Sequence, residues 1–325
     1  MDKKQAVLLY NKISDQPKED ELDVIRQMDH ISKALHKMGY ATHRIPFSID
    51  LSAAMTALRK INPYVVFNLV EMVEGTGELL SFGPFILNHL RLHYTGVPLE
   101  AMFLTTSKIL AKKTLNLLNI NTSGWCTTDQ LDTLKPDRMY IVKPIWEDGS
   151  LGLDEHCIFS GGDKEYLKKL KKYDKRKFFI EDYIDGREFN LSILGGKNGP
   201  QVMPPAEIHF VDYPEGKHRI VGYNAKWTED SFEYTHTPRT FRFPKKDQPL
   251  LEELKEMALH CWHGFDLKGY VRVDFRVDKN NVPYVLEING NPCISPESGY
   301  IAATKRAGLK FTDVVERIIE DAVTG

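Results

Sequence analysis

The most informative stretch of this chain is VRVDFRVDKNNVPYVLEIN, residues 271–289. Apolar and polar residues alternate on both sides of a central polar segment, which is the pattern of two half-buried strands joined by a turn. We therefore expect a hairpin with strands at 272–277 and 284–289. A four-residue loop over 279–282 would fix how the strands pair, since the turn sets the register of a hairpin.

The expected register brings two carboxylates face to face. It pairs three positions across the hairpin: Asp278 with Pro283, Asp274 with Glu287 and Arg272 with Asn289. Like charges about 5 Å apart destabilise a sheet unless a cation lies between them. Every candidate ligand here offers oxygen, which favours a hard divalent cation. The alternative is a solvent-exposed polar face with a slightly different register.

Several motifs along the chain resemble those of the ATP-grasp superfamily. EINGNP at 287–292 resembles the metal-binding end of these ligases. YIVKP at 140–144, followed by EDGSLG at 147–152, resembles their nucleotide-binding lysine strand and phosphate loop. FIEDYIDGREF at 179–189 resembles their adenine hinge and ribose-binding glutamate. These motifs stand in the order and spacing of the superfamily.

Further motifs narrow the resemblance to one branch. VFN at 66–68, YTGV at 94–97 and SK at 107–108 resemble the D-alanine–D-alanine ligase family. The match covers nearly the whole chain and is looser near the amino terminus. We therefore expect the fold and the ATP chemistry of that family.

The expected fold has three parts. A β-α-β-α-β pattern near the amino terminus indicates an open α/β unit, whose first helix ends at Gly39. The resemblance implies a three-part ATP-grasp fold of the α/β and α+β class, with the nucleotide bound between two α+β subdomains. Its expected parts are an amino-terminal domain at 1–97, a central subdomain at 98–185 and a carboxy-terminal subdomain with the metal site at 186–325.

The resemblance also implies a set of nucleotide contacts. Lysines would contact the phosphates, the glycine-containing loop would close over them, and a glutamate would bind the ribose hydroxyls. The expected residues are Lys108, Lys143, Gly149, Ser150, Gly152, Glu181, Asp182, Tyr183, Ile184, Glu188 and Lys226. Each lysine is also compatible with a surface position, and Glu188 with an exposed strand residue.

The chemistry implied by the resemblance is carboxylate–amine ligation through an acyl phosphate. Phosphoryl transfer needs magnesium ions and cationic side chains around the triphosphate. The implied catalytic residues are Arg272, which would stabilise an oxyanion, with Lys226, Gly149 and Ser150. The implied metal ligands are Asp274, Glu287 and Asn289. We expect ATP with two Mg²⁺ ions bridged by Glu287, with Mn²⁺ as a substitute.

The chain departs from the family pattern where the amino-acid substrates bind. YNKISD at 10–15 replaces a glycine-rich opening, and Glu21 is the candidate for a substrate-orienting glutamate that has no clear counterpart. Glu71 stands where the family has histidine, and Gly149 replaces a serine. Ser298 falls where the ligases bind the acceptor's carboxylate, although it is equally suited to cap the following helix. We expect retained ATP chemistry with altered substrate specificity.

Composition excludes several other classes of function. The 325 residues are 42% hydrophobic and 27% charged, with a formal net charge of −2, which argues against a nucleic-acid partner. The basic run at 164–177 is interpreted as a solvated helix face. No apolar segment fits a signal peptide or a membrane span, and four scattered cysteines favour a reducing, cytoplasmic setting. The expected partners are small carboxylates and amines, and the resemblance adds a homodimer.

Two other functions remain open at this point. One is an ATP-dependent kinase on the same scaffold, which would leave a phosphorylated product and no free phosphate. The other is a non-catalytic nucleotide-binding module, which the complete set of Asp274, Glu287 and Asn289 disfavours.

Overall fold

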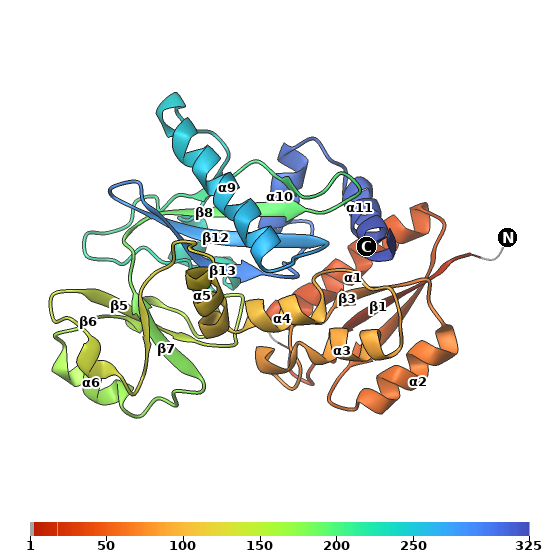
Figure 1. The fold of residues 1–325 in the computed structure, drawn as a ribbon, viewed down its shortest axis with the longest axis horizontal. Helices are drawn as coiled ribbons and strands as arrows, with labels where there is room; N and C mark the ends of the chain where they lie inside the picture. Colours follow the sequence, from red (N-terminus) through yellow and green to blue (C-terminus); the bar gives the residue numbers. More distant parts are fainter. Residues whose placement is uncertain (1–2, 18, 325) are drawn as a thin grey trace.

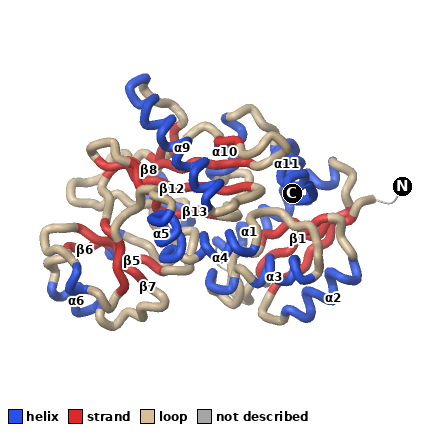
Figure 2. The backbone as a smooth tube through the Cα atoms, viewed as in Figure 1, coloured by secondary structure: helices blue, strands red, loops and turns tan. Residues whose placement is uncertain are grey.

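The computed structural model describes residues 3–17 and 19–324, which form three β-sheets (Figures 1 and 2). The first sheet is parallel, with strand order β2-β1-β3. Its elements are β1 (Gln5–Asn11), α1 (Glu19–Lys37), β2 (Ala41–Phe47), α2 (Leu51–Ile61) and β3 (Val65–Leu69). After α1, Gly39 adopts a φ of 85°, a left-handed conformation suited to ending a helix. The predicted open α/β unit is confirmed.

A second, antiparallel sheet, the central sheet, has the order β4-β7-β5-β6. Three helices lead to it: α3 (Phe82–His89), α4 (Leu99–Thr106) and α5 (Lys108–Leu117). Its own elements are β4 (Trp125–Thr127), β5 (Met139–Pro144), β6 (Ile158–Ser160), α6 (Lys164–Leu170) and β7 (Phe178–Asp182). Short 3₁₀ helices occur at Gly77–Leu79, Leu131–Thr133, Glu155–Cys157 and Lys245–Asp247.

The third sheet has the order β11-β10-β8-β12-β13, with β9 also paired to β8. Its strands are β8 (Gly186–Leu194), β9 (Gln201–Val202), β10 (Ala206–Ile208), β11 (Arg239–Thr240), β12 (Tyr270–Asp278) and β13 (Pro283–Asn289). The helices of this part are α7 (Tyr223–Trp227), α8 (Phe232–Thr235), α9 (Gln248–Gly264), α10 (Gly299–Arg306) and α11 (Phe311–Thr324). In Figure 1, α9 lies across this sheet, above the second sheet.

The β12–β13 hairpin confirms most of the predicted register. Asp274 lies opposite Glu287 and Arg272 opposite Asn289. The expected pairing of Asp278 with Pro283 is wrong, because Pro283 lies opposite Val277. A β-bulge at Leu286 shifts the register between the carboxylate pair and the turn, since an extra residue on one strand moves its partners by one position.

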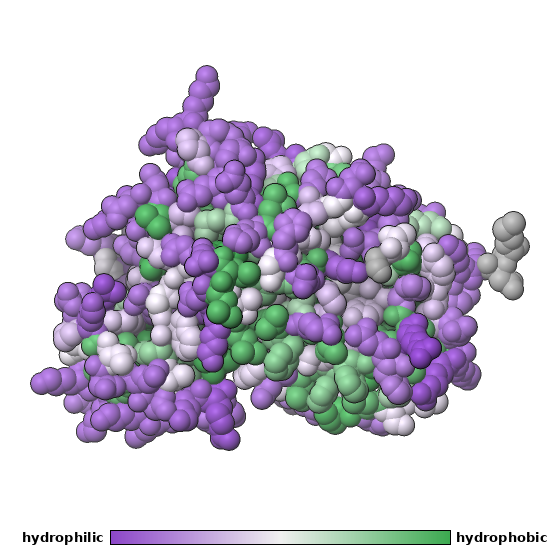
Figure 3. Space-filling view, in the orientation of Figure 1, coloured by the Kyte–Doolittle hydropathy of each residue, from purple (hydrophilic) through white to green (hydrophobic). Residues whose placement is uncertain are grey.

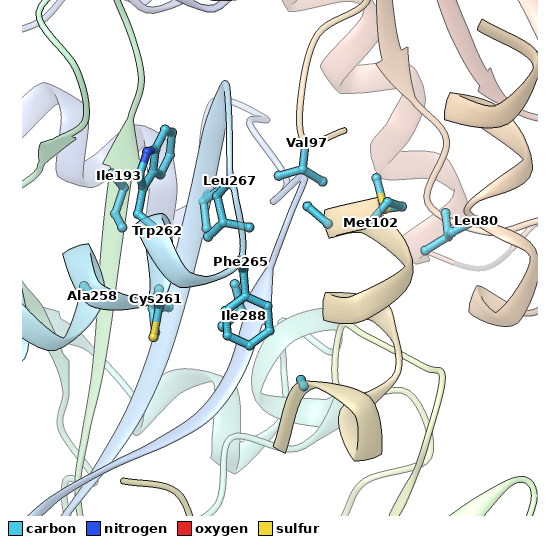
Figure 4. Packing of buried hydrophobic residues seen from close by; sticks show 14 of the residues in the cluster. Leu80, Val97, Met102, Ile193, Ala258, Cys261, Trp262, Phe265, Leu267 and Ile288 are labelled. Carbon is cyan, nitrogen blue, oxygen red and sulfur yellow. The ribbon is translucent and has the colours of Figure 1, made fainter. Parts of the chain in front are cut away.

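The amino-terminal and carboxy-terminal parts share their hydrophobic cores. One core joins β1 and α2 to β8, α9 and β12, and Figure 4 shows Trp262, Phe265 and Ile288 within it. A second core joins α1 and β3 to α10 and α11. The central sheet has a separate, smaller core. The first and third sheets therefore form a common base, and the second sheet stands apart from it.

The surface carries few large apolar groups. Figure 3 shows a mainly hydrophilic face with apolar residues gathered over α3 and α5. Phe85 of α3 and Leu117 of α5 are among the exposed large hydrophobic residues. Within residues 3–17 and 19–324, no helix is long and apolar enough to cross a membrane.

Phe275 tests the shared core beneath the hairpin. Its ring is fully buried, so Phe275→Ala should lower the free energy of unfolding in urea by about 3–5 kcal/mol. Phe85→Ala is the control, because that ring is 54% exposed and its loss should cost little. Equal losses in the two variants would show that the residues behind the hairpin do not pack as described.

Candidate active site

A cleft of about 1100 Å³ lies between the central sheet and the third sheet. The amino-terminal part closes one end of it with residues of α1 and of the segment after β3. The cleft collects nearly all residues expected from the sequence. Those lining it are Lys108, Lys143, Gly149, Ser150, Glu181, Asp182, Tyr183, Ile184, Glu188, Lys226, Arg272, Asp274, Glu287, Asn289 and Ser298. Gly152 and Glu21 lie outside this lining.

Three oxygen-bearing side chains of the hairpin converge in the cleft. Asn289 Nδ2 lies 3.3 Å from Asp274 Oδ2 and 3.5 Å from Glu287 Oε1. Asp274 is 6% exposed and also accepts hydrogen bonds of 2.7 Å from Asn190 and from Arg272 Nε. In the described part of the chain, no cluster of three or more His, Cys, Asp or Glu side chains is placed to hold a metal. Two carboxylates and one amide are therefore the donors available.

The charge on Glu287 suits a divalent cation. Burial by itself would raise the pKa of this carboxyl, but nearby cations outweigh it and lower the pKa to about 2. The cations are Lys108, Lys226, Arg272 and Lys143. Glu287 is thus ionised at neutral pH. An ionised carboxylate beside further oxygen donors fits Mg²⁺, which binds through a few carboxylates and completes its shell with water and phosphate oxygens.

Lys108 is buried within the cleft wall. Its side chain is 5% exposed, and Nζ donates to the Glu147 carbonyl at 2.6 Å and to Asp148 Oδ1 at 2.9 Å. Glu287 Oε2 lies 3.7 Å away. Burial opposes the charge, but the two carboxylates outweigh burial and raise the pKa of Lys108. The surface alternative for this lysine is therefore wrong.

The glycine-containing segment at 147–153 is tied to the chain around α7. Gly149, Ser150 and Gly152 have φ values of 66°, 62° and 71°. Trp227 Nε1 donates to the Gly149 carbonyl at 3.0 Å, and Ser150 Oγ donates to the Val221 carbonyl at 2.7 Å. These bonds hold the segment beside Lys226, on the same cleft. Two of the three left-handed positions are glycines, for which this conformation carries no steric penalty.

Glu181 anchors two lysines in the floor of the cleft. Its side chain is 1% exposed and forms ion pairs with Lys112, at 2.7 Å, and with Lys143. Ser123 Oγ donates to it at 2.8 Å. Burial by itself raises the pKa of Glu181, but the two lysines outweigh it and lower the pKa to about 2. Sequence reasoning missed Lys112, whose only signal is a lysine one turn after Lys108 on α5.

Glu188 is buried and paired. Arg276 Nη2 lies 2.9 Å from its carboxylate, and Arg276 also donates to the Gly186 carbonyl at 3.1 Å. The alternative of an exposed strand residue is wrong, because only 9% of Glu188 is exposed. The carboxylate is held by strand pairing, since Arg276 lies opposite Glu188 in the sheet.

The expectation for Glu21 is not met by the structure. Its carboxylate accepts hydrogen bonds from the Ser14 amide at 3.1 Å and the Ser14 hydroxyl at 2.9 Å, outside the cleft. Asp23 lines the cleft instead and is 5% exposed. Residues two apart point to opposite sides of a helix, which explains the difference. Asp23 Oδ2 accepts a hydrogen bond from the Cys293 thiol at 2.9 Å. Neither segment of sequence indicates this contact by itself.

Ser298 caps α10 as expected, and its contact with a substrate carboxylate stays a prediction. It is the N-cap of α10, where its Oγ accepts a hydrogen bond from the Ile301 amide at 3.3 Å. It also lines the cleft. The cap places the start of the helix, with its free amide groups, at the cleft wall.

Glu181 provides a test of this electrostatic arrangement. Glu181→Gln leaves two lysines without their shared anion, so the free energy of unfolding at pH 7 should fall by about 3–5 kcal/mol. Urea denaturation measures it. Glu253→Gln, on the exposed face of α9, should leave the value almost unchanged.

The loss of unfolding free energy in Glu181→Gln should also depend on pH. The pKa of Glu181 in the folded protein, about 2, lies below its usual value of 4.5, so its stabilisation is present above pH 4.5 and is lost as the pH falls toward 2. The difference between the wild type and Glu181→Gln should therefore shrink over that range. A constant difference would contradict the ion-pair account.

Known proteins of one family match this chain in sequence. A family model described as the D-ala D-ala ligase C-terminus matches residues 136–320. D-alanine–D-alanine ligases from Rickettsia canadensis and Carboxydothermus hydrogenoformans are each 30% identical to this chain. The first alignment spans 296 residues, 90% of this chain and 77% of the relative. The second spans 312 residues, 91% of this chain and 92% of the relative.

Solved structures share the fold over almost the full length. The D-alanine–D-alanine ligase from Bacillus anthracis complexed with ATP has a TM-score of 0.73 at 21% identity, covering 98% of this chain and 97% of that chain. D-alanyl-alanine synthetase A from Vibrio cholerae has a TM-score of 0.76 at 15% identity, covering 99% of each chain. The predicted ATP-grasp fold is confirmed. With the family model and the curated relatives, these likenesses show that the chain belongs to the D-alanine–D-alanine ligase family.

Proposed function

We propose that this ATP-dependent ligase joins two amino acids through an acyl phosphate, with D-alanine as the first substrate to test. Members of this family form a carbon–nitrogen bond at the expense of ATP and use a divalent metal. The choice of D-alanine rests on the names of the relatives. The observation that carries the proposal is the convergence of Asp274, Glu287 and Asn289 beside Lys108 and Arg272.

In this proposal, the hairpin holds the metal. Asp274, Glu287 and Asn289 would bind two Mg²⁺ ions, with Glu287 shared between them, and Mn²⁺ would substitute. When bound, such ions neutralise the phosphate oxygens of ATP during phosphoryl transfer. Lys108, which is buried, and Lys143, which is partly buried, line the same cleft and would bind the phosphates as fixed positive charges.

The remaining nucleotide contacts are part of the same proposal. The segment 147–153 and Lys226 would cover the phosphates and exclude water, which matters because an acyl phosphate hydrolyses. The backbone of 182–184 would bind the adenine edge, beside the carboxylate of Glu181. Glu188, held by Arg276, would accept hydrogen bonds from the ribose hydroxyls.

Arg272 would stabilise the oxyanion that forms when the amine attacks. Its Nε and Nη2 groups bind the two oxygens of Asp274 at 2.7 and 2.8 Å, which fixes the plane of the guanidinium. A guanidinium has further N–H groups beyond those two bonds, and it stays charged at every physiological pH. A fixed cation at this position would stabilise negative charge as it develops.

The substrate end of the cleft carries the differences from the family pattern. Asp23 would take the orienting role expected of Glu21, because an ionised carboxylate attracts a substrate ammonium group. Ser298, at the start of α10, would contact the carboxylate of the amine substrate.

The proposal extends to the organisation of the chain. We infer that the central sheet closes on the remaining two parts, because it has a separate core, whereas α4 and α5 of the subdomain expected at 98–185 pack in the core of the third sheet. Boundaries at 97 and 185 and a homodimer complete the proposal, the latter on the family resemblance alone.

Product analysis tests the function. The purified chain, incubated with Mg²⁺, ATP and D-alanine, should release ADP and phosphate in equal amounts and form a dipeptide detectable by mass spectrometry. A panel of other amino acids should be assayed in parallel. A phosphorylated amino acid without free phosphate would contradict the ligase function and indicate a kinase.

Glu287→Gln tests the metal site. Loss of the ionised carboxylate should lower kcat by about 100-fold or more, the scale expected for a group that stabilises transition-state charge. The melting temperature should stay close to that of the wild type. Glu256→Gln, on the exposed face of α9, is the matched control. Normal turnover in Glu287→Gln would rule out the assigned ligand set.

A further inference from the structure

Arg239 differs from the other arginines that line the cleft. Each of the other three forms an ion pair: Arg26 with Glu19 at 3.4 Å, Arg272 with Asp274 at 2.7 Å and Arg276 with Glu188 at 2.9 Å. Among the described residues, no carboxylate lies within ion-pair distance of Arg239. A guanidinium that faces the cleft without an anion is suited to bind one from solution.

Arg239 is also close to another positive charge. Burial and the nearby charge of Arg272 both lower the pKa of Arg239. Two cations in the same part of a cleft repel each other unless an anion lies between them. Arg239 keeps an exposed surface although neighbouring residues crowd its guanidinium, so an anionic ligand has a route to it.

The start of α10 lies against the same guanidinium. Gly299 is the first residue of this eight-residue helix, and a Cβ added to it would lie 3.2 Å from Arg239 Nη2. The absence of a side chain at Gly299 lets the guanidinium approach the backbone. The first amide groups of a helix have no partner within it and carry partial positive charge. Arg239 and this helix start therefore both present positive charge to the same part of the cleft.

We propose that Arg239 is a substrate-binding residue which, with the start of α10, binds the carboxylate of the amine substrate. The inference rests on the ligase function proposed above and adds a residue to its amine-substrate site. An amine substrate whose carboxylate is replaced by an amide should therefore bind poorly. A planar guanidinium favours this choice because it binds both oxygens of a carboxylate at once.

The segment that carries Arg239 explains why the sequence did not reveal it. Arg239 lies on β11, a two-residue edge strand that pairs with β10 through Ile208. No motif resembling the family was found between Trp227 and α9. Only the sheet pairing brings this arginine to the cleft, beside residues about sixty positions later in the chain.

Chemical labelling of the full chain tests the inference without relying on turnover. Phenylglyoxal modifies accessible arginines, and mass spectrometry reports the labelling of Arg239 and of Arg242, an exposed arginine outside the cleft lining. Labelling is measured with Mg-ADP alone and with Mg-ADP plus D-alanine, L-alanine or β-alanine, or the amide of each.

We expect at least one free acid, near saturation, to reduce labelling of Arg239 by about tenfold, as occupancy of the site requires. Its amide should give no protection, and labelling of Arg242 should not change. Protection by Mg-ADP alone would assign Arg239 to the nucleotide. Equal protection by acids and amides, or none by any acid, would overturn the inference.

Kinetics of Arg239→Gln provide a second readout. The KM for the amine substrate should rise about 10- to 100-fold, the effect of losing a charge-assisted hydrogen bond, while the KM for ATP stays the same. Arg239→Lys should recover part of the loss, and Arg242→Gln should behave as the wild type. An unchanged amine KM in Arg239→Gln would overturn the inference.

The proposed ligase function and the proposed carboxylate site at Arg239 can be contradicted independently. If D-alanine forms no dipeptide but another amino acid protects Arg239 and its amide does not, the choice of D-alanine is wrong and the carboxylate site stands. If D-alanine is ligated but no acid protects Arg239, the ligase stands and the carboxylate site is wrong.

Discussion

The site depends on one electrostatic constraint, the pairing of Asp274 with Glu287 across β12 and β13. Like charges directly opposite each other weaken a sheet, so the surroundings must compensate. Arg272 binds the first carboxylate through two hydrogen bonds, and Lys108 lies 3.7 Å from the second. Those cations offset the repulsion between the two carboxylates at the position proposed for a divalent cation. The charges that stabilise the hairpin are thus also the charges that would handle a triphosphate.

The shared cores give this hairpin a firm support. The first and third sheets are joined by two hydrophobic cores, and the apolar face of β12 lies within one of them. The central sheet, which carries Lys143 and Glu181, has its own core. Asp274 and Glu287 therefore lie on a separately packed part of the molecule from Lys143 and Glu181. Closure of the cleft over ATP would bring the two parts together.

The hairpin and the amino-terminal unit could be predicted because their signals are local, and most cleft residues because their motifs resemble those of the family. Alternation fixed the faces of β12, and spacing gave the pairing of Asp274 with Glu287. The bulge at Leu286 has no such signal, since nothing in the sequence marks an extra residue inside a strand. The Asp23–Cys293 and Glu181–Lys112 contacts join distant segments, so one sequence could not reveal them. Glu21 was chosen by distance along the chain, which does not determine the side of a helix that faces the cleft.

The proposed chemistry requires ATP to activate a substrate carboxylate by phosphorylating it in this cleft. An amino-acid substrate labelled with ¹⁸O in its carboxylate allows the isotope to be followed during turnover. Each phosphate released should carry one ¹⁸O atom, because the oxygen that receives the phosphoryl group leaves with it. Phosphate free of ¹⁸O, or label appearing in AMP, would contradict the acyl-phosphate mechanism.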